Sequence, residues 1–258
     1  MALQFDSIVF GPIHSRRLGS SLGVNLLPKH GKICTFDCIY CECGWNADGR
    51  RDSRIPTREE VFVELESGVR ACHDSGTPVD TITFSGNGEP TFHPDFPAII
   101  DKTLEIRDKF FPKAKVSVLS NATMLSRPGI KEALAKVDNP ILKLDGATDE
   151  FARMMDRPQQ KDYSLKAVEE QMRWFKGNFI LQTMFLRGEV DGVRVDSTDK
   201  TIVEAWRHLV ERLGPREVMM YTLDRVPPVS TLGKVTVAEM EAIAAPLVAE
   251  GFKVQIKG

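Results

Sequence analysis

The 258-residue chain lacks the features that mark membrane, secreted or nucleic-acid-binding proteins. It has no apolar run long enough to cross a bilayer and no continuous apolar core of a secretion signal near its N-terminus. Its 34 basic and 36 acidic residues leave a formal net charge of -2, which gives no support to a broad nucleic-acid-binding surface, although a local basic patch is compatible with it. We therefore expect a cytoplasmic globular protein that does not bind membranes.

Cysteine is also scarce, with five residues in all and none after Cys72. The odd number and the absence of a secretion signal disfavour a disulfide framework. No cysteine is followed by proline, so the chain lacks the Cys-Pro that commonly supplies a ferredoxin-like cluster with its fourth ligand. Cys72 falls within a helical pattern, and we expect it to be a small buried hydrophobic residue.

The other four cysteines lie together in residues 32–45, K-I-C-T-F-D-C-I-Y-C-E-C-G-W. Cys34, Cys38 and Cys41 form a C-x3-C-x2-C pattern, and three thiolates this close can hold three irons of a cubane [4Fe–4S] cluster. The fourth iron then stays open for another ligand. Cys43 adds a fourth thiol, so a zinc site is an alternative. Structural zinc, however, usually uses two separate cysteine pairs rather than one crowded loop.

Apolar strands alternate with amphipathic helices along the rest of the chain, without repeats or low-complexity tracts. A capping box of Thr57 and Glu60 predicts the start of the first helix. We expect strands at 23–27, 79–84, 115–120, 141–144, 179–186, 217–221 and 252–256, and helices at 95–110, 128–137 and 236–250 among others. We expect residues 187–197 to form a polar loop. This order predicts a parallel α/β sheet, without deciding between an open sheet and a curved barrel.

The cysteine pattern, with Tyr40 as the aromatic residue before Cys41, resembles the signature of the radical S-adenosylmethionine (SAM) superfamily. Residues 11–19, 21–25 and 85–91 resemble the branch that contains wyosine-type tRNA enzymes and uncharacterised bacterial iron–sulfur oxidoreductases. The similarity runs from about residue 11 to the C-terminus. It implies a (β/α)6 partial TIM barrel, with residues 1–258 as a single domain and with a [4Fe–4S] cluster and SAM as cofactors.

The resemblance also implies an activity. Such an enzyme reductively cleaves SAM at the cluster, giving methionine and a 5′-deoxyadenosyl radical that abstracts hydrogen from a substrate. It needs an electron donor such as flavodoxin or ferredoxin. Two readings without SAM chemistry are an iron–sulfur electron carrier and a zinc-binding module, and neither requires the polar residues described next.

In barrels of this kind, chemistry gathers at the carboxyl ends of the strands. There the chain has a loop of Gly86, Asn87, Gly88 and Glu89, which resembles the superfamily's Gly-Gly-Glu segment that binds the amino group of SAM. Its glycines would let the backbone approach a ligand closely. Asn87 departs from the family pattern, where Gly is usual. A plain turn is the alternative reading.

Four more polar residues follow the next two strands: Ser120, Asn121, Lys143 and Asp145. By the resemblance, such positions meet the ribose hydroxyls and the methionine carboxylate of SAM. Lys143 has the right charge for the carboxylate, and Asp145 or Asn121 would accept from the ribose. Ordinary turn formation at strand ends explains them equally well.

Two further positions are candidates for contact with SAM. Tyr40 would pack near the adenine, or simply against the first helix. Gln182 and Thr183 interrupt an apolar strand, so they either face the cofactor or are hydrogen-bonded inside the core. His93 is expected to be part of the structure of its loop.

The substrate is not identified by these residues. Arg16, Arg17, Asp224 and Arg225 are candidates for the substrate end, since an arginine pair suits a phosphate or carboxylate. Wyosine-type enzymes have further cysteines in an N-terminal extension, and no cysteine precedes Cys34 here. Peptide-maturing members have a C-terminal cysteine-rich domain, which is also not seen. We therefore transfer neither substrate, and a glycyl-radical activase is a further alternative.

Overall fold

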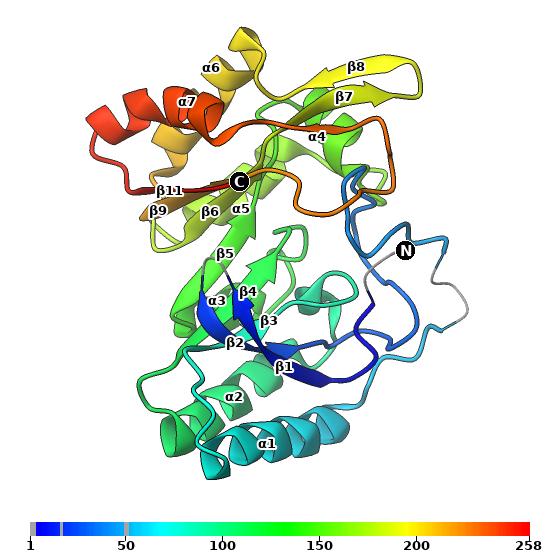
Figure 1. Ribbon diagram of the computed structural model, residues 1–258, viewed down its shortest axis with the longest axis vertical. Helices are drawn as coiled ribbons and strands as arrows, with labels where there is room; N and C mark the ends of the chain where they lie inside the picture. Colours follow the sequence, from blue (N-terminus) through cyan, green and yellow to red (C-terminus); the bar gives the residue numbers. More distant parts are fainter. Residues whose placement is uncertain (1–3, 16–17, 49–51) are drawn as a thin grey trace.

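The computed structural model describes residues 4–15, 18–48 and 52–258. Its centre is one sheet in the order β1-β2-β3-β4-β5-β6-β9-β11 (Figure 1). β1 runs antiparallel to β2, and every other neighbouring pair is parallel. The strands are β1 (Val9–Ser15), β2 (Gly19–Val24), β3 (Thr81–Phe84), β4 (Lys115–Ser120), β5 (Asn139–Lys143), β6 (Ile180–Met184), β9 (Glu217–Tyr221) and β11 (Val254–Lys257).

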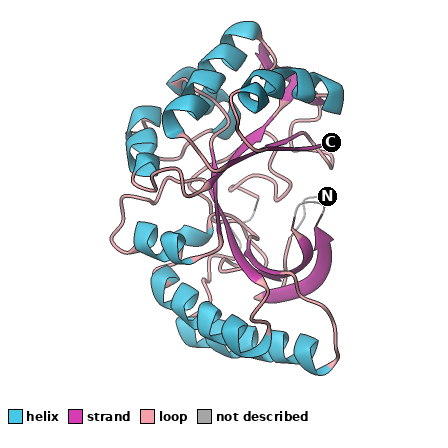
Figure 2. Ribbon diagram, turned by 90° about the vertical axis from the view of Figure 1, so that its left-hand side faces the viewer, coloured by secondary structure: helices cyan, strands magenta, loops and turns pink. Residues whose placement is uncertain are grey.

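The sheet curls, and the helices cover its convex side, which leaves the concave side to loops (Figure 2). The helices are α1 (Arg58–Asp74), α2 (Phe96–Phe110), α3 (Ile130–Lys136), α4 (Asp149–Asp156), α5 (Leu165–Arg173), α6 (Lys200–Leu213) and α7 (Val237–Ala249), with a 3-10 turn η1 (Pro90–Phe92). This is the predicted (β/α)6 partial barrel, with β1 and β11 added at its two edges. Among the described helices, none combines the length and apolar character needed to span a membrane.

The predicted start of the first helix is confirmed. The Thr57 side chain accepts from the Glu60 backbone N–H at 3.2 Å, and the Glu60 carboxylate accepts from the Thr57 N–H at 2.8 Å, so two otherwise unpaired donors are satisfied. Val61, Leu65 and Cys72 of α1 are buried, as their helical spacing predicts.

The core has two layers, because residues along each strand alternate between the two faces of the sheet. The larger layer lies between the sheet and the helices. A small separate cluster of Ile141, Ile180 and Met219, joined by Leu18 and Leu119, fills the concave side. It forms an apolar floor beneath the carboxyl ends of the strands, where the polar residues lie.

One prediction of secondary structure was wrong, and one strand was missed. The loop expected at 187–197 contains a hairpin of β7 (Leu186–Val190) and β8 (Val193–Asp196), to which β10 (Gly233–Lys234) adds a third strand. Asp191 and Gly192, both with positive φ, form its two-residue turn. β1 was not predicted at all. It contains Pro12 and an irregular register, features that are confined to edge strands and hide the period of two.

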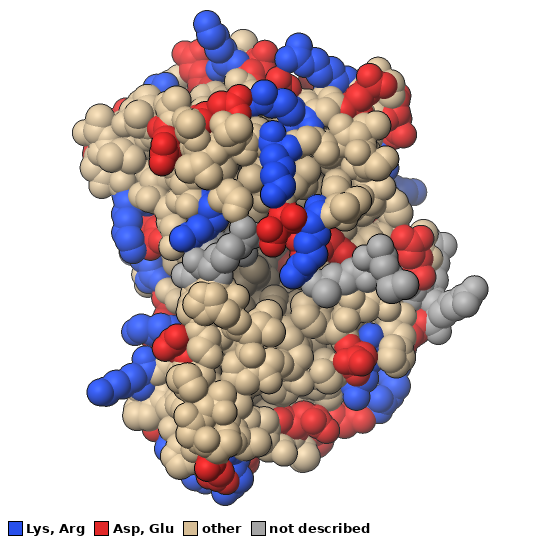
Figure 3. All heavy atoms as spheres, viewed as in Figure 1, with Lys and Arg blue, Asp and Glu red and all other residues tan. Residues whose placement is uncertain are grey.

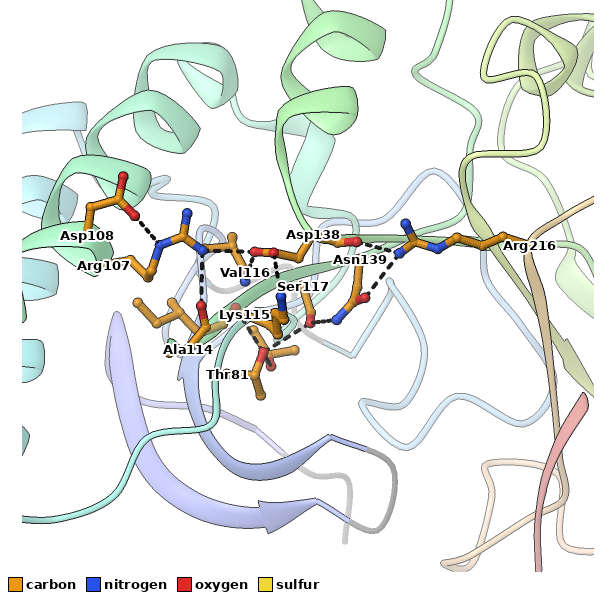
Figure 4. A network of polar contacts seen from close by, with 12 residues as sticks. Thr81, Arg107, Asp108, Ala114, Lys115, Val116, Ser117, Asp138, Asn139 and Arg216 are labelled. Carbon is orange, nitrogen blue, oxygen red and sulfur yellow. Dashed lines mark hydrogen bonds and ion pairs between the residues drawn. The ribbon is translucent and has the colours of Figure 1, made fainter. Parts of the chain in front are cut away.

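A polar network ties together the amino ends of the strands, opposite the cysteine loop (Figure 4). The Asp138 carboxylate accepts from Arg107 at 2.8 Å, from the Val116 N–H at 2.9 Å and from Lys115 at 3.1 Å. Arg216 donates to the Asp138 carbonyl and to the Asn139 side chain. In barrels this end serves stability rather than chemistry.

Candidate active site

The three predicted cluster ligands line one cavity of about 220 Å³ at the carboxyl ends of the strands. Its walls come from the cysteine loop, from the loop after β3 and from the ends of β4, β5, β6 and β9. The lining residues are Lys32, Cys34, Phe36, Cys38, Tyr40, Cys41, Ser85, Gly86, Gly88, Glu89, Leu119, Ser120, Asn121, Lys143, Gln182 and Tyr221. Segments up to 189 positions apart in the sequence, from Lys32 to Tyr221, are therefore brought to one hollow.

The cysteine loop, which has no regular structure over most of its length, is held from outside by backbone hydrogen bonds. The Asp37 and Ile39 N–H groups donate to the carbonyls of Asp156 and Met155 at 2.9 and 3.0 Å, at the end of α4. The Asn46 side chain donates to the carbonyls of Cys34 and Phe36 at 3.1 and 3.0 Å. These contacts hold the backbone of the cysteine loop in place against the end of α4.

Lys32 is a site residue that the sequence reasoning did not single out. It is only 5% exposed, and its ammonium donates to the Gly44 carbonyl at 2.7 Å and to the Asp37 carboxylate at 3.1 Å. Burial alone would lower its pKa, but the nearby Cys41, Cys34 and Cys38, together with Asp37, raise it above its ordinary value. A permanent positive charge therefore lies among the three thiols.

A second lysine, Lys143, is half-buried at the opposite wall. The Lys143 ammonium is 2.9 Å from the Asp145 carboxylate, also contacts the Asp156 carboxylate, and is 3.6 Å from the Cys38 sulfur. Burial would lower the pKa of Lys143, but the two carboxylates outweigh it and raise the pKa. The Tyr40 hydroxyl donates to Asp145 as well, and that carboxylate lies behind the cavity wall, fully buried.

The cysteine thiols differ in acidity. Burial raises the pKa of Cys34 to about 12 and raises that of Cys38 as well. The pKa of Cys41 is instead lowered to about 6, chiefly by a hydrogen bond with the Cys43 thiol and, against burial, by the charge of Lys32. Cys43 itself lies 3.4 Å from the Gly86 carbonyl oxygen, to which its thiol donates.

The two glycines of the loop after β3 have positive φ, of 147° at Gly86 and 135° at Gly88. A Cβ on Gly88 would lie 1.8 Å from the Ile33 carbonyl oxygen, and one on Gly86 would lie 2.4 Å from the Asn25 side chain. Glycine is required here because the loop packs against β2 and the cysteine loop. The sequence analysis expected these glycines to let a ligand approach the backbone closely. At these two Cα positions, other parts of the protein make the close approach instead, although both residues also line the cavity.

Asn87 points away from the cavity. Its side-chain amide donates to the carbonyls of Phe5 and Pro28, each at 2.8 Å, and its oxygen accepts from the Phe5 N–H at 3.0 Å. The residue that departs from the family pattern therefore fastens the N-terminal segment. Only its backbone stays in the loop beside the cysteines, where its carbonyl accepts from the Ile33 N–H.

Glu89 lines the cavity, but protein donors already surround its carboxylate. One oxygen accepts from the Ser120 hydroxyl at 2.8 Å and from Thr91, and the other accepts from the Asn121 N–H at 2.7 Å. Burial raises the pKa of Glu89 despite these hydrogen bonds. It therefore joins the loop after β3 to the end of β4 as well as presenting negative charge to the cavity.

The other predicted positions divide between the two faces of the sheet. The Asn121 amide donates to Thr35 at 2.8 Å and lies 3.6 Å from the Cys34 sulfur, so it joins β4 to the cysteine loop. Gln182 lines the cavity, whereas Thr183 donates to the Leu144 carbonyl and accepts from Trp206 on the helix side. His93 bonds the Pro56 carbonyl and the Asp95 N–H, as expected of a residue that shapes its loop.

Two of the four substrate-end candidates lie at a second, outer cavity. Asp224 and Arg225 line it, and Arg225 pairs with Glu42 of the cysteine loop. Arg16 and Arg17 lie outside the described residues.

The donor set suits a cubane cluster. The three thiols line one cavity, and the ammonium groups of Lys32 and Lys143 lie close enough to offset part of the charge of their thiolates. Among the described residues, no three His, Cys, Asp or Glu side chains converge on a point where one metal ion could bind. A cubane needs no such convergence, because each thiolate binds a different iron.

A family model confirms the class that the fold and the cavity indicate. Residues 29–200 match the model of the radical SAM superfamily, so the chain belongs to that superfamily, and it is an enzyme. The family implies SAM and an iron–sulfur cluster as cofactors.

Individual relatives agree. The UPF0026 protein of Helicobacter pylori is 28% identical over 99% of this chain and 78% of its own length. Streptococcus suis SuiB bound to SAM has a TM-score of 0.63 at 14% identity, over 88% of this chain. This chain spans 49% of SuiB. TYW1 with a lysine–pyruvate adduct bound has a TM-score of 0.62 at 14% identity, over 92% of this chain and 76% of that one. The superfamily is thus confirmed.

Proposed function

We propose that this enzyme cleaves SAM reductively at a [4Fe–4S] cluster held by Cys34, Cys38 and Cys41. The observation that carries the proposal is that these three thiols and the polar strand ends line the same cavity. With cluster and SAM bound, the chemistry supplied is one-electron cleavage to methionine and a 5′-deoxyadenosyl radical, which abstracts hydrogen from a substrate. The two readings without SAM chemistry, an electron carrier and a zinc-binding module, give no reason for polar strand ends around the thiols.

The protein's own part is to hold and orient. The cysteine loop is fixed by the end of α4, and Lys32 and Lys143 provide positive charge near the thiolates. Gln182, Ser120 and the loop after β3 supply hydrogen-bonding groups to the part of the cavity that SAM would fill. The apolar floor formed by the Ile180 cluster limits water from below.

The roles of individual residues toward SAM are part of this proposal. Lys143 is the last residue of β5, and its ammonium already contacts the carboxylates of Asp145 and Asp156. It would therefore bind the SAM carboxylate while staying paired with these two residues. Asp145 would act through Tyr40 and Lys143 rather than on the ribose directly. Tyr40 and Gly86 line the cavity and stay candidates for adenine and backbone contacts.

The test is an assay for 5′-deoxyadenosine. Anaerobically reconstituted protein is reduced with dithionite and given SAM without further substrate. We expect 5′-deoxyadenosine from the wild type and none from Cys34→Ala, whereas Cys72→Ala, which changes a buried residue on α1, should be as active as the wild type. If the wild type with a fully loaded cluster gives no product, electron paramagnetic resonance with and without SAM shows whether SAM binds to the cluster. A cluster signal unchanged by SAM would contradict the proposal.

The substrate is left open at this level. TYW1 was solved with a lysine–pyruvate adduct and SuiB with its precursor peptide, so neighbours of this fold act on unlike molecules. We propose a separate electron donor, such as flavodoxin or ferredoxin, because one cluster bound at the SAM site needs an external source of electrons.

A further inference from the structure

A second cavity of about 370 Å³ adjoins the cysteine-lined one. Tyr40, Cys41 and Tyr221 line both, so the two hollows meet at these side chains. The other lining residues are Ile13, His14, Ser15, Glu42, Met184, Thr222, Leu223, Asp224, Arg225 and Lys257. They come from β1, the cysteine loop, the end of β6, the segment after β9, and the last residues of β11.

The outer cavity occupies the opening of the incomplete barrel. β1 and β11 are the first and last strands of the sheet and do not pair with each other, yet both contribute to its wall. Figure 3 shows a hollow near the middle of this face, with basic and acidic side chains along its upper edge. A molecule in this opening reaches the cysteine-lined cavity past Tyr40 and Tyr221 without crossing the sheet.

The charged side chains that line the outer cavity differ in whether they already have an interaction partner. Glu42 and Arg225 pair with each other across the rim, and Asp224 also makes an interaction of its own. Lys257 forms no ion pair or hydrogen bond through its side chain with any described residue. It stands opposite Tyr221 in the parallel pairing of β11 and β9, so its side chain leaves the sheet on the same face as Tyr221, the concave one.

We propose that the outer cavity binds the substrate and that the Lys257 ammonium holds an acidic group of it, a carboxylate or a phosphate. This inference rests on the proposed function and adds the chemical class of substrate, a small anionic molecule. The volume falls within the range of small-molecule sites, roughly 300 to 1,000 Å³. A lysine supplies the point charge that suits either anion, and the shared wall with Tyr40 and Tyr221 brings the other end of the molecule toward SAM.

The experiment uses pyridoxal 5′-phosphate, an anionic aldehyde that forms an imine with lysine, followed by borohydride reduction and peptide mass mapping. Lys166, an exposed lysine of α5, is the internal control. We expect Lys257 to be labelled about tenfold faster than Lys166, since a reagent bound in the cavity keeps its aldehyde close to this side chain. Succinate or inorganic phosphate should protect Lys257 and leave Lys166 unchanged, whereas the neutral succinamide should protect neither.

Each possible result of this experiment either supports the proposal or overturns it. Protection by succinate indicates a carboxylate site, protection by phosphate a phosphate site, and protection by both the shared anion site. Equal labelling of the two lysines, protection of both alike, protection by succinamide, or no protection by either anion would overturn the proposal. Labelling is measured with and without cluster, so failure to form 5′-deoxyadenosine would contradict the proposed function and leave this result standing.

Discussion

At the scale of single residues, the buried Lys32 and the half-buried Lys143 flank the cysteines in different ways. Lys143 is shared between two carboxylates, Asp145 and Asp156, so most of its charge is compensated locally. Lys32 has one carboxylate partner, Asp37, and a backbone carbonyl, and the Asp37 oxygen also accepts from the Asn46 N–H at 2.8 Å. Lys32 therefore leaves more positive charge near the thiolates, where low dielectric strengthens its effect.

Replacing Lys32 should make the cluster harder to reduce. In Lys32→Met the positive charge near the thiolates is lost, so the more negative, reduced cluster is destabilised and its midpoint potential should shift to more negative values. Lys32→Arg keeps the charge and should shift it much less. A redox titration followed by electron paramagnetic resonance, on samples matched for iron content, gives the answer. Equal potentials in wild type and Lys32→Met would show that Lys32 only holds the loop together.

Cys43 should be dispensable for the cluster. Its thiol is directed at the Gly86 carbonyl oxygen and the residue is not among those that line the cysteine cavity. We expect Cys43→Ala to retain the iron and sulfide content of the wild type after reconstitution, whereas Cys38→Ala should lose the cluster. Iron and acid-labile sulfide analysis is the measurement. Loss of iron in Cys43→Ala would mean that the ligands are assigned wrongly.

At the scale of elements, the strands carry different chemistry at their two ends. Their carboxyl ends present the polar residues of the cavity, and their amino ends are joined by the network around Asp138 (Figure 4). That network links α2, β4, β5 and the segment before β9, so it should contribute to stability without contributing to chemistry. Burial would raise the pKa of Asp138, but the Val116 N–H, Lys115 and Arg107 lower it overall.

Asp138→Asn should destabilise the protein by about 1 to 3 kcal/mol at pH 7, because charged hydrogen bonds to a partly buried carboxylate are lost. The folded-state pKa is depressed, so this stabilisation is complete above the ordinary aspartate pKa, about 4, and is lost as pH falls through the lower folded-state value. The difference between variant and wild type should thus shrink in acid. Urea unfolding at several pH values measures it.

Asp108→Asn is the matched control for that experiment. Asp108 bonds the same Arg107 side chain at 2.5 Å, but its own side chain is 66% exposed. Surface substitutions of this kind change stability by no more than about 0.5 kcal/mol. If both variants lose equal stability, the network at the amino ends is not the cause.

At the scale of the whole molecule, the sheet is a barrel that does not close. β1 and β11 extend the six-stranded core at either edge, and the space between them is the outer cavity. The contact of Glu42 with Arg225 spans 183 positions of sequence and joins the cysteine loop to the segment after β9. In the proposed binding mode, a substrate therefore enters between these two edges on its way to the thiols.

The sequence by itself determined the local features. The cysteine spacing, the capping box at Thr57 and the alternation of apolar strands with helices depend on residues close in the chain, so they could be read without a fold. The six-stranded core followed from that order, while its curvature came from the family resemblance. The same reasoning singled out Ser120 at the end of a strand and Gln182 within one, and the structure has both in the cavity wall.

Only the tertiary structure decided which polar residues face the cavity. The Asn87 side chain bonds Phe5, which is 82 positions away, and the Tyr40 hydroxyl bonds Asp145, which is 105 positions away. No local sequence pattern encodes such partners. Burial of Lys32 among the thiols depends on the fold of the whole loop, and the need for glycine at 86 and 88 depends on Asn25 and Ile33. Contacts between distant segments therefore set the charge, the shape and the opening of the site.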